Sequence, residues 1–263
     1  MIRFDGVGFG YRDGPMLLHG VDFAVEPGNV ACLVGRNGAG KSTILRLASG
    51  LERCVEGRIR IGGQELASSD PTEIAASIGV VFQASDRHIV CASLLDEVAL
   101  GSRLLGACAA DANARARNAL ERVGLAGLAS RHPFDLNAGE RRLGGVAAAI
   151  AHIPRVLLVD EVQRGLDASH MRRLEAVIEA ERRRGCAVLI ACHDMDFVGR
   201  NAGFVLHVAR GGVRKSTTRA FFACRPTMVA PPELHVLADG CGRAPKGSSR
   251  AFVDDVLDRL RNR

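Results

Sequence analysis

Eight consecutive residues near the start of the chain have the types and spacing needed to hold phosphate. Residues 35–42 read Gly-Arg-Asn-Gly-Ala-Gly-Lys-Ser and fit the pattern GxxxxGK[ST]. Glycines allow backbone N–H groups to turn inward around phosphate oxygens. Lys41 can bring a positive charge to the terminal phosphates, and the Ser42 hydroxyl can ligate Mg²⁺. The residues expected to contact a nucleotide here are Gly35, Asn37, Gly38, Gly40, Lys41, Ser42 and Thr43.

Two acids follow an apolar run further along the chain. Residues 156–159 are Val-Leu-Leu-Val, and Asp160 and Glu161 come directly after them. Asp160 suits the coordination sphere of Mg²⁺, through a water molecule. Glu161 is placed to polarise a water that attacks the γ-phosphate, and a positioned general base contributes roughly 10²–10⁴-fold to a rate. An acid pair could also simply end a strand, but the phosphate loop upstream favours a site that cleaves a nucleoside triphosphate.

The segments around these residues have the patterns of a parallel α/β sheet. Val30–Val34 is a continuous apolar run before the phosphate loop, as in a strand buried on both faces, and Ser42–Leu51 has helical spacing after it. Arg155–Asp160 and Cys186–Cys192 are further buried strands, and the charged helix Met171–Arg184 lies between them. Ligands of such folds bind at the carboxyl edge of the sheet, so we expect the loop and the acids to meet there.

The remaining segments also have patterns that predict strands and helices. We expect short strands in the N-terminal quarter, a mostly helical region from about 88 to 151, and one last strand before a glycine pair. The expected strands are Ile2–Phe9, Val21–Val25, Gly57–Gly63, Ile78–Phe82 and Val205–Val208, and the expected helices in the later regions are Asp111–Val123 and Ala251–Arg263.

The composition is that of a soluble globular protein and excludes disordered and collagen-like chains. Hydrophobic residues make up 47% and charged residues 24% of the 263 residues. The net charge of +6 lies in residues 210–263, which hold 11 basic and 5 acidic side chains. This basic end could contact an anionic membrane or nucleic acid, or form a solvated surface. Aromatic residues are only 4%, too few to expect a stacking platform for single-stranded nucleic acid.

Cysteine spacing indicates the redox compartment of the protein, and hydropathy indicates how it could associate with a membrane. The eight cysteines contain no CxxC pair and no zinc spacing, which indicates a reducing compartment without structural disulfides. The longest uncharged apolar stretch, residues 143–153, is much shorter than the roughly 20 residues that span a bilayer. We therefore expect any membrane association to be peripheral.

Four further motifs give the sequence a family resemblance. Gln83 follows the strand at 78–82, and Leu136-Asn137-Ala138-Gly139-Glu140 precedes the acid strand. Gly165-Leu166-Asp167 follows the acids, and His193-Asp194 follows the strand at 186–192. In this order, residues 1–215 resemble the nucleotide-binding domain of ATP-binding cassette (ABC) proteins. The resemblance implies a P-loop NTPase with a parallel core sheet, an antiparallel β subdomain and a helical subdomain, which binds ATP and Mg²⁺.

The resemblance also implies roles for residues outside the two central motifs. Tyr11 would stack on adenine, and Gln83 would touch Mg²⁺ or the attacking water and sense a membrane partner. His193 would contact the γ-phosphate and hold the catalytic geometry. Asp167 would cross a dimer interface. The signature residues Asn137, Gly139 and Glu140 would lie at a helix start, facing the ATP held by a second chain, so that two chains enclose two ATP molecules head to tail.

Two segments suggest a subtype. Residues 81–90 and 95–101 are similar to the ATPases of energy-coupling factor transporters, which take up transition-metal ions or vitamins. This resemblance implies an ATP-hydrolysing subunit on the cytoplasmic face of the membrane, partnered by integral membrane subunits and not by nucleic acid. Two alternatives stay open: a soluble ABC ATPase acting on nucleic acid or ribosomes, and a regulatory ATP-binding subunit with weak hydrolysis. We expect an ATPase domain over 1–212, and a basic extension over 213–263 that could form a small helical element.

The signature departs from the family pattern. Asn137 and Ala138 stand where the family usually has Ser and Gly, and Val162-Gln163 stands where it usually has Pro-Thr. An Asn amide can still donate to phosphate, but the methyl group of Ala138 lies where the backbone should approach the anion closely. We therefore expect this chain to pair with a second, different ATPase chain or to tolerate slow turnover; a homodimer would carry the altered signature at both sites.

Overall fold

The computed structural model describes residues 1–12, 14–82 and 89–223. Gln83 and the helix expected at 251–263 lie outside the described residues. Within these ranges, no helix has the length and apolar character needed to cross a bilayer.

A six-stranded sheet forms the centre of the protein. Its strands are β3 (Val30–Val34), β6 (Ile78–Val81), β7 (Val156–Asp160), β8 (Ala187–Ala191), β9 (Phe204–Ala209) and β10 (Gly212–Thr217). Their order is β10-β9-β3-β8-β7-β6, and only β10 at the edge pairs antiparallel with its neighbour. Strands β3, β7 and β8 are buried along their whole length, as expected for central parallel strands covered on both faces.

A second sheet packs beside the first. It consists of β1 (Ile2–Gly10), β2 (Met16–Val25), β4 (Glu56–Ile61) and β5 (Gln64–Glu65), paired antiparallel in the order β2-β1-β4-β5. Helix α1 (Lys41–Ala48) contributes Ile44, Leu45 and Leu47 to the core shared by the two sheets. The phosphate loop thus leads directly into a helix anchored between the sheets.

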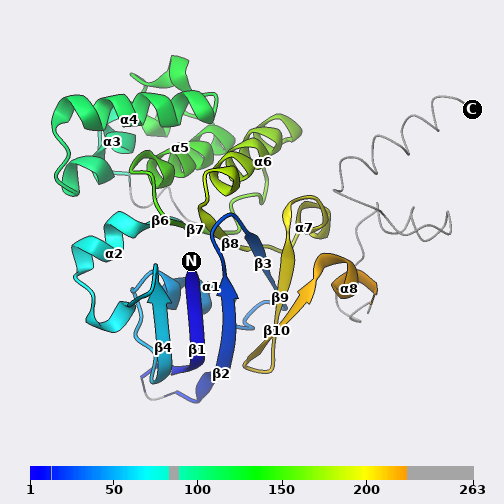
Figure 1. The fold of residues 1–263 in the computed structure, drawn as a ribbon. Coiled ribbons are helices and arrows are strands. Elements are labelled where there is room, and N and C mark those ends of the chain that lie inside the picture. The colour runs from blue at the N-terminus through cyan, green and yellow to red at the C-terminus, as the bar shows by residue number, and fades with distance from the viewer. Residues whose placement is uncertain (13, 83–88, 224–263) are drawn as a thin grey trace, which may run out of the picture.

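The remaining helices cover the other face of the six-stranded sheet or flank it. They are α2 (Pro71–Ser77), α3 (Leu94–Leu104), α4 (Ala109–Arg122), α5 (Ala138–Ala151), α6 (Ala168–Arg183), α7 (Met195–Asn201) and α8 (Thr218–Ala223), with short 3-10 helices at Leu66–Ser68, Ala126–Leu128 and Pro133–Asp135. Figure 1 shows α3, α4 and α5 gathered at the top of the view, away from the antiparallel sheet.

Alternation along the buried strands divides the core into two clusters. Cys32 and Val34 of β3 pack in the cluster that includes the helical side, whereas Ala31 and Leu33 pack with α1 and the antiparallel sheet. The same alternation occurs along β7 and β8. Successive strand residues point to opposite faces, so one apolar run supplies both cores.

The expected fold class is confirmed, with shifts at helix ends. The strand at Val30–Val34 is as expected, but the helix expected to reach Leu51 ends at Ala48, because Gly50 adopts a left-handed φ of 78°. The helix expected from Met171 begins at Ala168, because Asp167 caps it. The six-stranded sheet continues to Thr217 through β10, while the predicted domain division at residue 212 stays a prediction.

Candidate functional site

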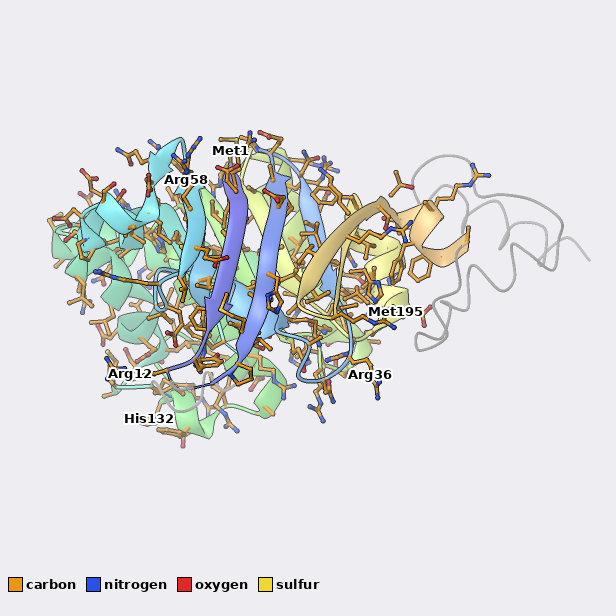
Figure 2. The ribbon with its side chains drawn as sticks, turned by 90° about the horizontal axis from the view of Figure 1, so that it is seen from below. Met1, Arg12, Arg36, Arg58, His132 and Met195 are labelled. Carbon is orange, nitrogen blue, oxygen red and sulfur yellow. The ribbon has the colours of Figure 1, made fainter. Side chains whose placement is uncertain are left out.

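The phosphate loop links β3 to α1 through glycines that other residues could not replace. A Cβ on Gly35 would lie 2.4 Å from the backbone oxygen of Val208, and Gly40 caps α1 with a φ of 103°. Asn37 and Gly38 lie exposed in the turn between them. The loop therefore leaves its backbone and the N-terminus of α1 open toward an anion. In Figure 2, Arg36 of this loop and Arg12 lie at one end of the molecule, opposite Met1 and Arg58.

Lys41 is folded back onto the loop. Its Nζ donates to the backbone oxygens of Gly35 at 2.9 Å and of Arg36 at 3.1 Å, and the residue is only 6% exposed. Burial lowers the pKa of Lys41, although the charges of Glu161 and Asp160 act in the opposite direction. The ammonium is therefore held beside the acids by groups that a phosphate could displace.

Asp160 ends β7 with an incompletely satisfied carboxylate. The residue is 7% exposed, and its Oδ1 has no hydrogen-bond partner among the described residues. Burial raises the pKa of Asp160, and a hydrogen bond from Ser42 opposes this rise. A buried oxygen without a partner next to a hydroxyl fits the oxygen-rich coordination of Mg²⁺. Among the described residues, no group of three or more His, Cys, Asp or Glu side chains is arranged to hold a metal ion.

Glu161 and His193 are brought together by neighbouring strands. Strands β7 and β8 pair in parallel, and the Glu161 N–H donates to the backbone oxygen of Ala191 at 3.1 Å. His193 Nε2 lies 2.7 Å from Glu161 Oε1. Glu161 has a φ of 51°, a conformation that non-glycine residues adopt mostly where the surrounding structure imposes it. The strand ends thus aim a carboxylate and an imidazole at the same point beside the phosphate loop.

Tyr11 lies near the first turn of α1. Its hydroxyl is 3.2 Å from Thr43 Oγ1, and Phe9 packs edge-on against its ring with centroids 4.9 Å apart. Tyr11 is 45% exposed. This placement is compatible with a stacking partner above the phosphate loop, and stacking on adenine stays a prediction.

The signature residues start α5, as expected. The Asn137 side chain accepts from the Glu140 N–H at 2.9 Å, and the Glu140 carboxylate accepts from the Asn137 N–H at 2.9 Å, which forms a capping box. The Asn137 amide nitrogen is not used in this cap and can donate to an anion. Asn137, which stands where the family usually has Ser, therefore still caps α5 through its amide oxygen and leaves its amide nitrogen outside the cap.

Asp167 caps α6 and is tied to the signature through His170, a residue that sequence reasoning missed. Asp167 accepts from the Ser169 and His170 N–H groups at 2.8 and 2.9 Å, and His170 Nδ1 lies 2.8 Å from its other oxygen. These bonds hold the pKa of Asp167 well below its usual range. A Cβ on Gly139 would lie 2.9 Å from His170 Nδ1. The only signal for His170 was its spacing three residues after a helix cap.

The predicted site residues therefore form two groups. The first comprises the phosphate loop with Asp160, Glu161 and His193. The second comprises the starts of α5 and α6. Asn137 and Glu140 hydrogen-bond to each other at the start of α5, and Asp167 accepts from His170 at the start of α6.

Comparison with known proteins identifies this arrangement. A sequence model described as "ABC transporter" matches residues 18–164. The chain belongs to the ABC transporter family. It is an ABC-type ATPase, the nucleotide-binding and nucleotide-hydrolysing subunit of a transporter, and the expected fold and enzyme class are thereby confirmed.

Individual ABC proteins align over most of the chain. The cell division ATP-binding protein FtsE of Escherichia coli is 35% identical over 215 residues, covering 80% of this chain and 96% of FtsE. CbiO1 of Clostridium perfringens, described as part of the ABC transporter complex CbiONQ, is 25% identical with a TM-score of 0.78, over 90% of this chain and 94% of CbiO1. The dimeric ATP-binding cassette MJ0796 with ADP and Pi shares the fold at 23% identity and a TM-score of 0.74, over 83% of this chain and 99% of MJ0796.

Proposed function

We propose that this chain is the ATP-hydrolysing subunit of an energy-coupling factor transporter that takes up a transition-metal ion or a vitamin. The solute would be bound by integral membrane partners, and this chain would attach to them at the cytoplasmic face. The sequence of residues 81–90 and 95–101 and the similarity to CbiO1 support this subtype. Specificity for the solute belongs to the membrane subunits in this proposal.

The active unit in this proposal is a dimer with two ATP molecules at its interface. The phosphate loop and Lys41 of one chain would hold the phosphates from one side. Asn137, Gly139 and Glu140 of the second chain would contact the same ATP from the other side, where the N-terminus of α5 favours negative charge. The second chain is a different ATPase in a heterodimer, or a second copy in a homodimer with slower turnover.

Hydrolysis would use the carboxylate and imidazole at the ends of β7 and β8. Glu161 would accept a hydrogen bond from the attacking water, and His193 would hold Glu161 and contact the γ-phosphate. The 2.7 Å contact between these side chains beside Lys41 is the observation that carries the proposal. Ser42 and Asp160 would hold Mg²⁺, which when bound offsets the charge on the phosphate oxygens.

Replacing the proposed base tests the mechanism. Glu161→Gln is expected to lower ATP hydrolysis by at least about 100-fold, because an amide cannot take the proton of the attacking water. ATP binding should persist, so the variant should accumulate as an ATP-bound dimer in size-exclusion chromatography with light scattering. Glu175→Gln, on the surface of α6 where Glu175 pairs with Arg200, is the matched control. Hydrolysis by Glu161→Gln at the wild-type rate would show that Glu161 is not the base.

The membrane partner is tested by purification of the chain from membranes and identification of what accompanies it. Membrane subunits that restore solute uptake in vesicles would support the transporter assignment. The 35% identity to the cell division protein FtsE favours a second candidate, an ATPase that acts in cell division through a membrane partner. Co-purification with such a partner, without any uptake activity, would replace the first proposal with the second.

A further inference from the structure

Behind the Glu161–His193 contact, a buried hydrogen bond joins the same two segments of the chain. Gln163 Nε2 donates to Cys192 Sγ at 3.1 Å. Gln163 is 4% exposed and Cys192 is fully buried. Gln163 lies two residues after Glu161, and Cys192 lies directly before His193. The link therefore spans the strand ends that carry the two reacting side chains.

The thiol extends this link past His193. Cys192 Sγ donates to the backbone oxygen of Asp194 at 3.3 Å, and the Asp194 side chain caps α7 by accepting from the Phe197 N–H at 2.9 Å. Burial raises the pKa of Cys192 to about 12, so the sulfur stays protonated at neutral pH and can both accept and donate. The backbone is thus held on both sides of His193.

The amide of Gln163 is poorly explained by stability alone. Its Oε1 is buried without a hydrogen-bond partner among the described residues. A methionine of similar length would fill the same space without an unsatisfied oxygen. The feature that the amide adds is its donor nitrogen toward Cys192, which points to a role in the site.

We propose that Gln163 and Cys192 are positioning residues for ATP hydrolysis. Their hydrogen bond fixes the backbone around His193 so that its imidazole stays against the Glu161 carboxylate. This inference rests on the roles proposed above for Glu161 and His193. Both side chains are buried, so the link is expected to act on the rate of the chemical step while leaving nucleotide affinity unchanged.

The test measures kcat and KM for ATP with the full chain, together with its partner chain where one co-purifies. Cys192→Ala is expected to lower kcat by about tenfold to hundredfold with KM unchanged, since a small misplacement of reacting groups has this effect. Cys192→Ser keeps both a donor and an acceptor and should restore most of kcat. Cys186→Ala is the matched control, because Cys186 is a similarly buried thiol that lies before β8, at the opposite end of the strand from Cys192, and donates to the adjacent backbone oxygen of Ala187. The kcat of this variant should stay at the wild-type value.

Gln163→Met gives a second, independent measurement. Its melting temperature should equal or exceed that of the wild type while kcat falls, and adding Cys192→Ala should cause no further fall in kcat. Equal kcat values for Cys192→Ala and Cys186→Ala, or no recovery in Cys192→Ser, would overturn the proposal. Glu161→Gln is measured in parallel. If this variant hydrolyses ATP at the wild-type rate, the proposed catalytic role of Glu161 is refuted. If it loses hydrolysis while Cys192→Ala keeps the wild-type kcat, only the positioning role of Gln163 and Cys192 is refuted.

Discussion

At the residue scale, the surroundings of Asp160 disfavour its charged form in the folded protein. Its carboxylate is almost completely buried, and one oxygen lacks a hydrogen bond within the described ranges. Burial raises its pKa above the ordinary value of 3.8, which means that the folded protein disfavours the charged form. Such a side chain contributes little to folding stability, and its unsatisfied oxygen supports the proposed Mg²⁺ site.

Replacing Asp160 should separate stability from binding. A carboxyl with a raised folded pKa leaves stability unaffected below about pH 3.8, and lowers it as pH rises through the folded pKa. Asp160→Asn is therefore expected to raise the melting temperature of the nucleotide-free protein at pH 7 but not at pH 3.5. ATP with Mg²⁺ at 100 times Kd should stabilise the wild type by about 2.7 kcal/mol and the variant by less than half of that. Calorimetry that finds a lower melting temperature for the variant at pH 7 would contradict this reading.

At the scale of elements, the starts of α5 and α6 form one unit. Asn137 and Glu140 cap α5 reciprocally, Asp167 caps α6, and His170 lies between the two starts. Gly139 leaves the space that the His170 ring occupies. A movement of either helix start would therefore shift the other, and both carry residues predicted to face a second chain.

If the two helix starts act together, Gly139→Ala should weaken dimer formation and a second substitution at His170 should restore part of it. Gly139→Ala would place a methyl group 2.9 Å from His170 Nδ1, so the ring must leave its contact with Asp167. We expect ATP-driven dimer formation, measured by light scattering, to weaken by about tenfold, equivalent to about 1.4 kcal/mol. Adding His170→Ala should relieve the clash and recover dimer formation in part. Gly101→Ala in α3, where the added Cβ meets nothing, should dimerise normally and gain about 0.5–1 kcal/mol in stability. A double variant no better than Gly139→Ala would argue against the shared unit.

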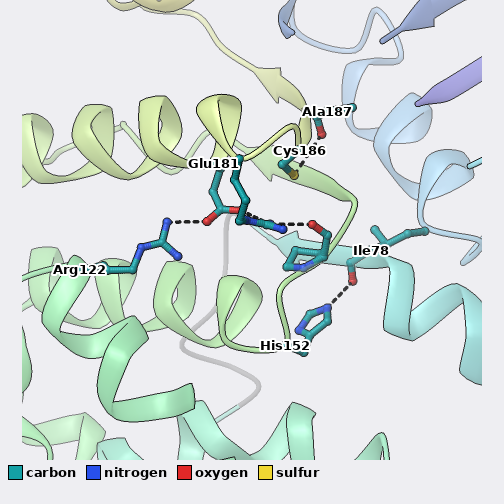
Figure 3. A network of polar contacts seen from close by, with 8 residues as sticks. Ile78, Arg122, His152, Glu181, Cys186 and Ala187 are labelled. Carbon is teal, nitrogen blue, oxygen red and sulfur yellow. Dashed lines mark hydrogen bonds and ion pairs between the residues drawn. The ribbon is translucent and has the colours of Figure 1, made fainter. Parts of the chain in front are cut away.

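At the scale of the whole molecule, one buried carboxylate connects the helical region to the central sheet. Glu181 of α6 is fully buried and pairs with Arg122 of α4 and with Arg184, which also donates to the backbone oxygen of Pro154 before β7 (Figure 3). Close by, His152 at the end of α5 hydrogen-bonds to the backbone oxygen of Ile78 at 3.2 Å. These contacts fix the helices relative to the strands that carry the acids.

Removing this charge should destabilise the whole domain. Glu181→Gln leaves two guanidinium groups without their anion, and we expect a loss of about 3 kcal/mol in unfolding free energy, at the low end for a broken buried pair because the arginines are partly exposed. Glu179→Gln on the same helix is the control, since Glu179 also pairs with two arginines but is 41% exposed, and it should change stability by less than about 1 kcal/mol. Chemical denaturation measures both variants, and equal losses would show that burial does not set the difference.

Local patterns in the sequence predicted most of the fold and both central motifs. The phosphate loop and the acid pair depend on neighbours within a few residues, and a backbone that needs glycine or an apolar run that needs burial is visible in the sequence itself. The helix start at Asn137 was expected only from the family resemblance. Helix ends were less predictable, because Gly50 and Asp167 decided them through backbone conformation and capping.

Contacts between distant segments were decided only in the folded structure. His193 meets Glu161 because β8 lies beside β7, and the buried bond from Gln163 to Cys192 depends on the same strand pairing. His170 reaches Gly139 because α6 packs on α5. The phosphate loop and the acid pair by themselves predicted that this chain binds and cleaves a nucleoside triphosphate, since that chemistry resides in short motifs. The side chains that position those motifs relative to one another come from elements far apart in the chain. Their contacts depend on how these elements pack, and no local sequence pattern predicts that packing.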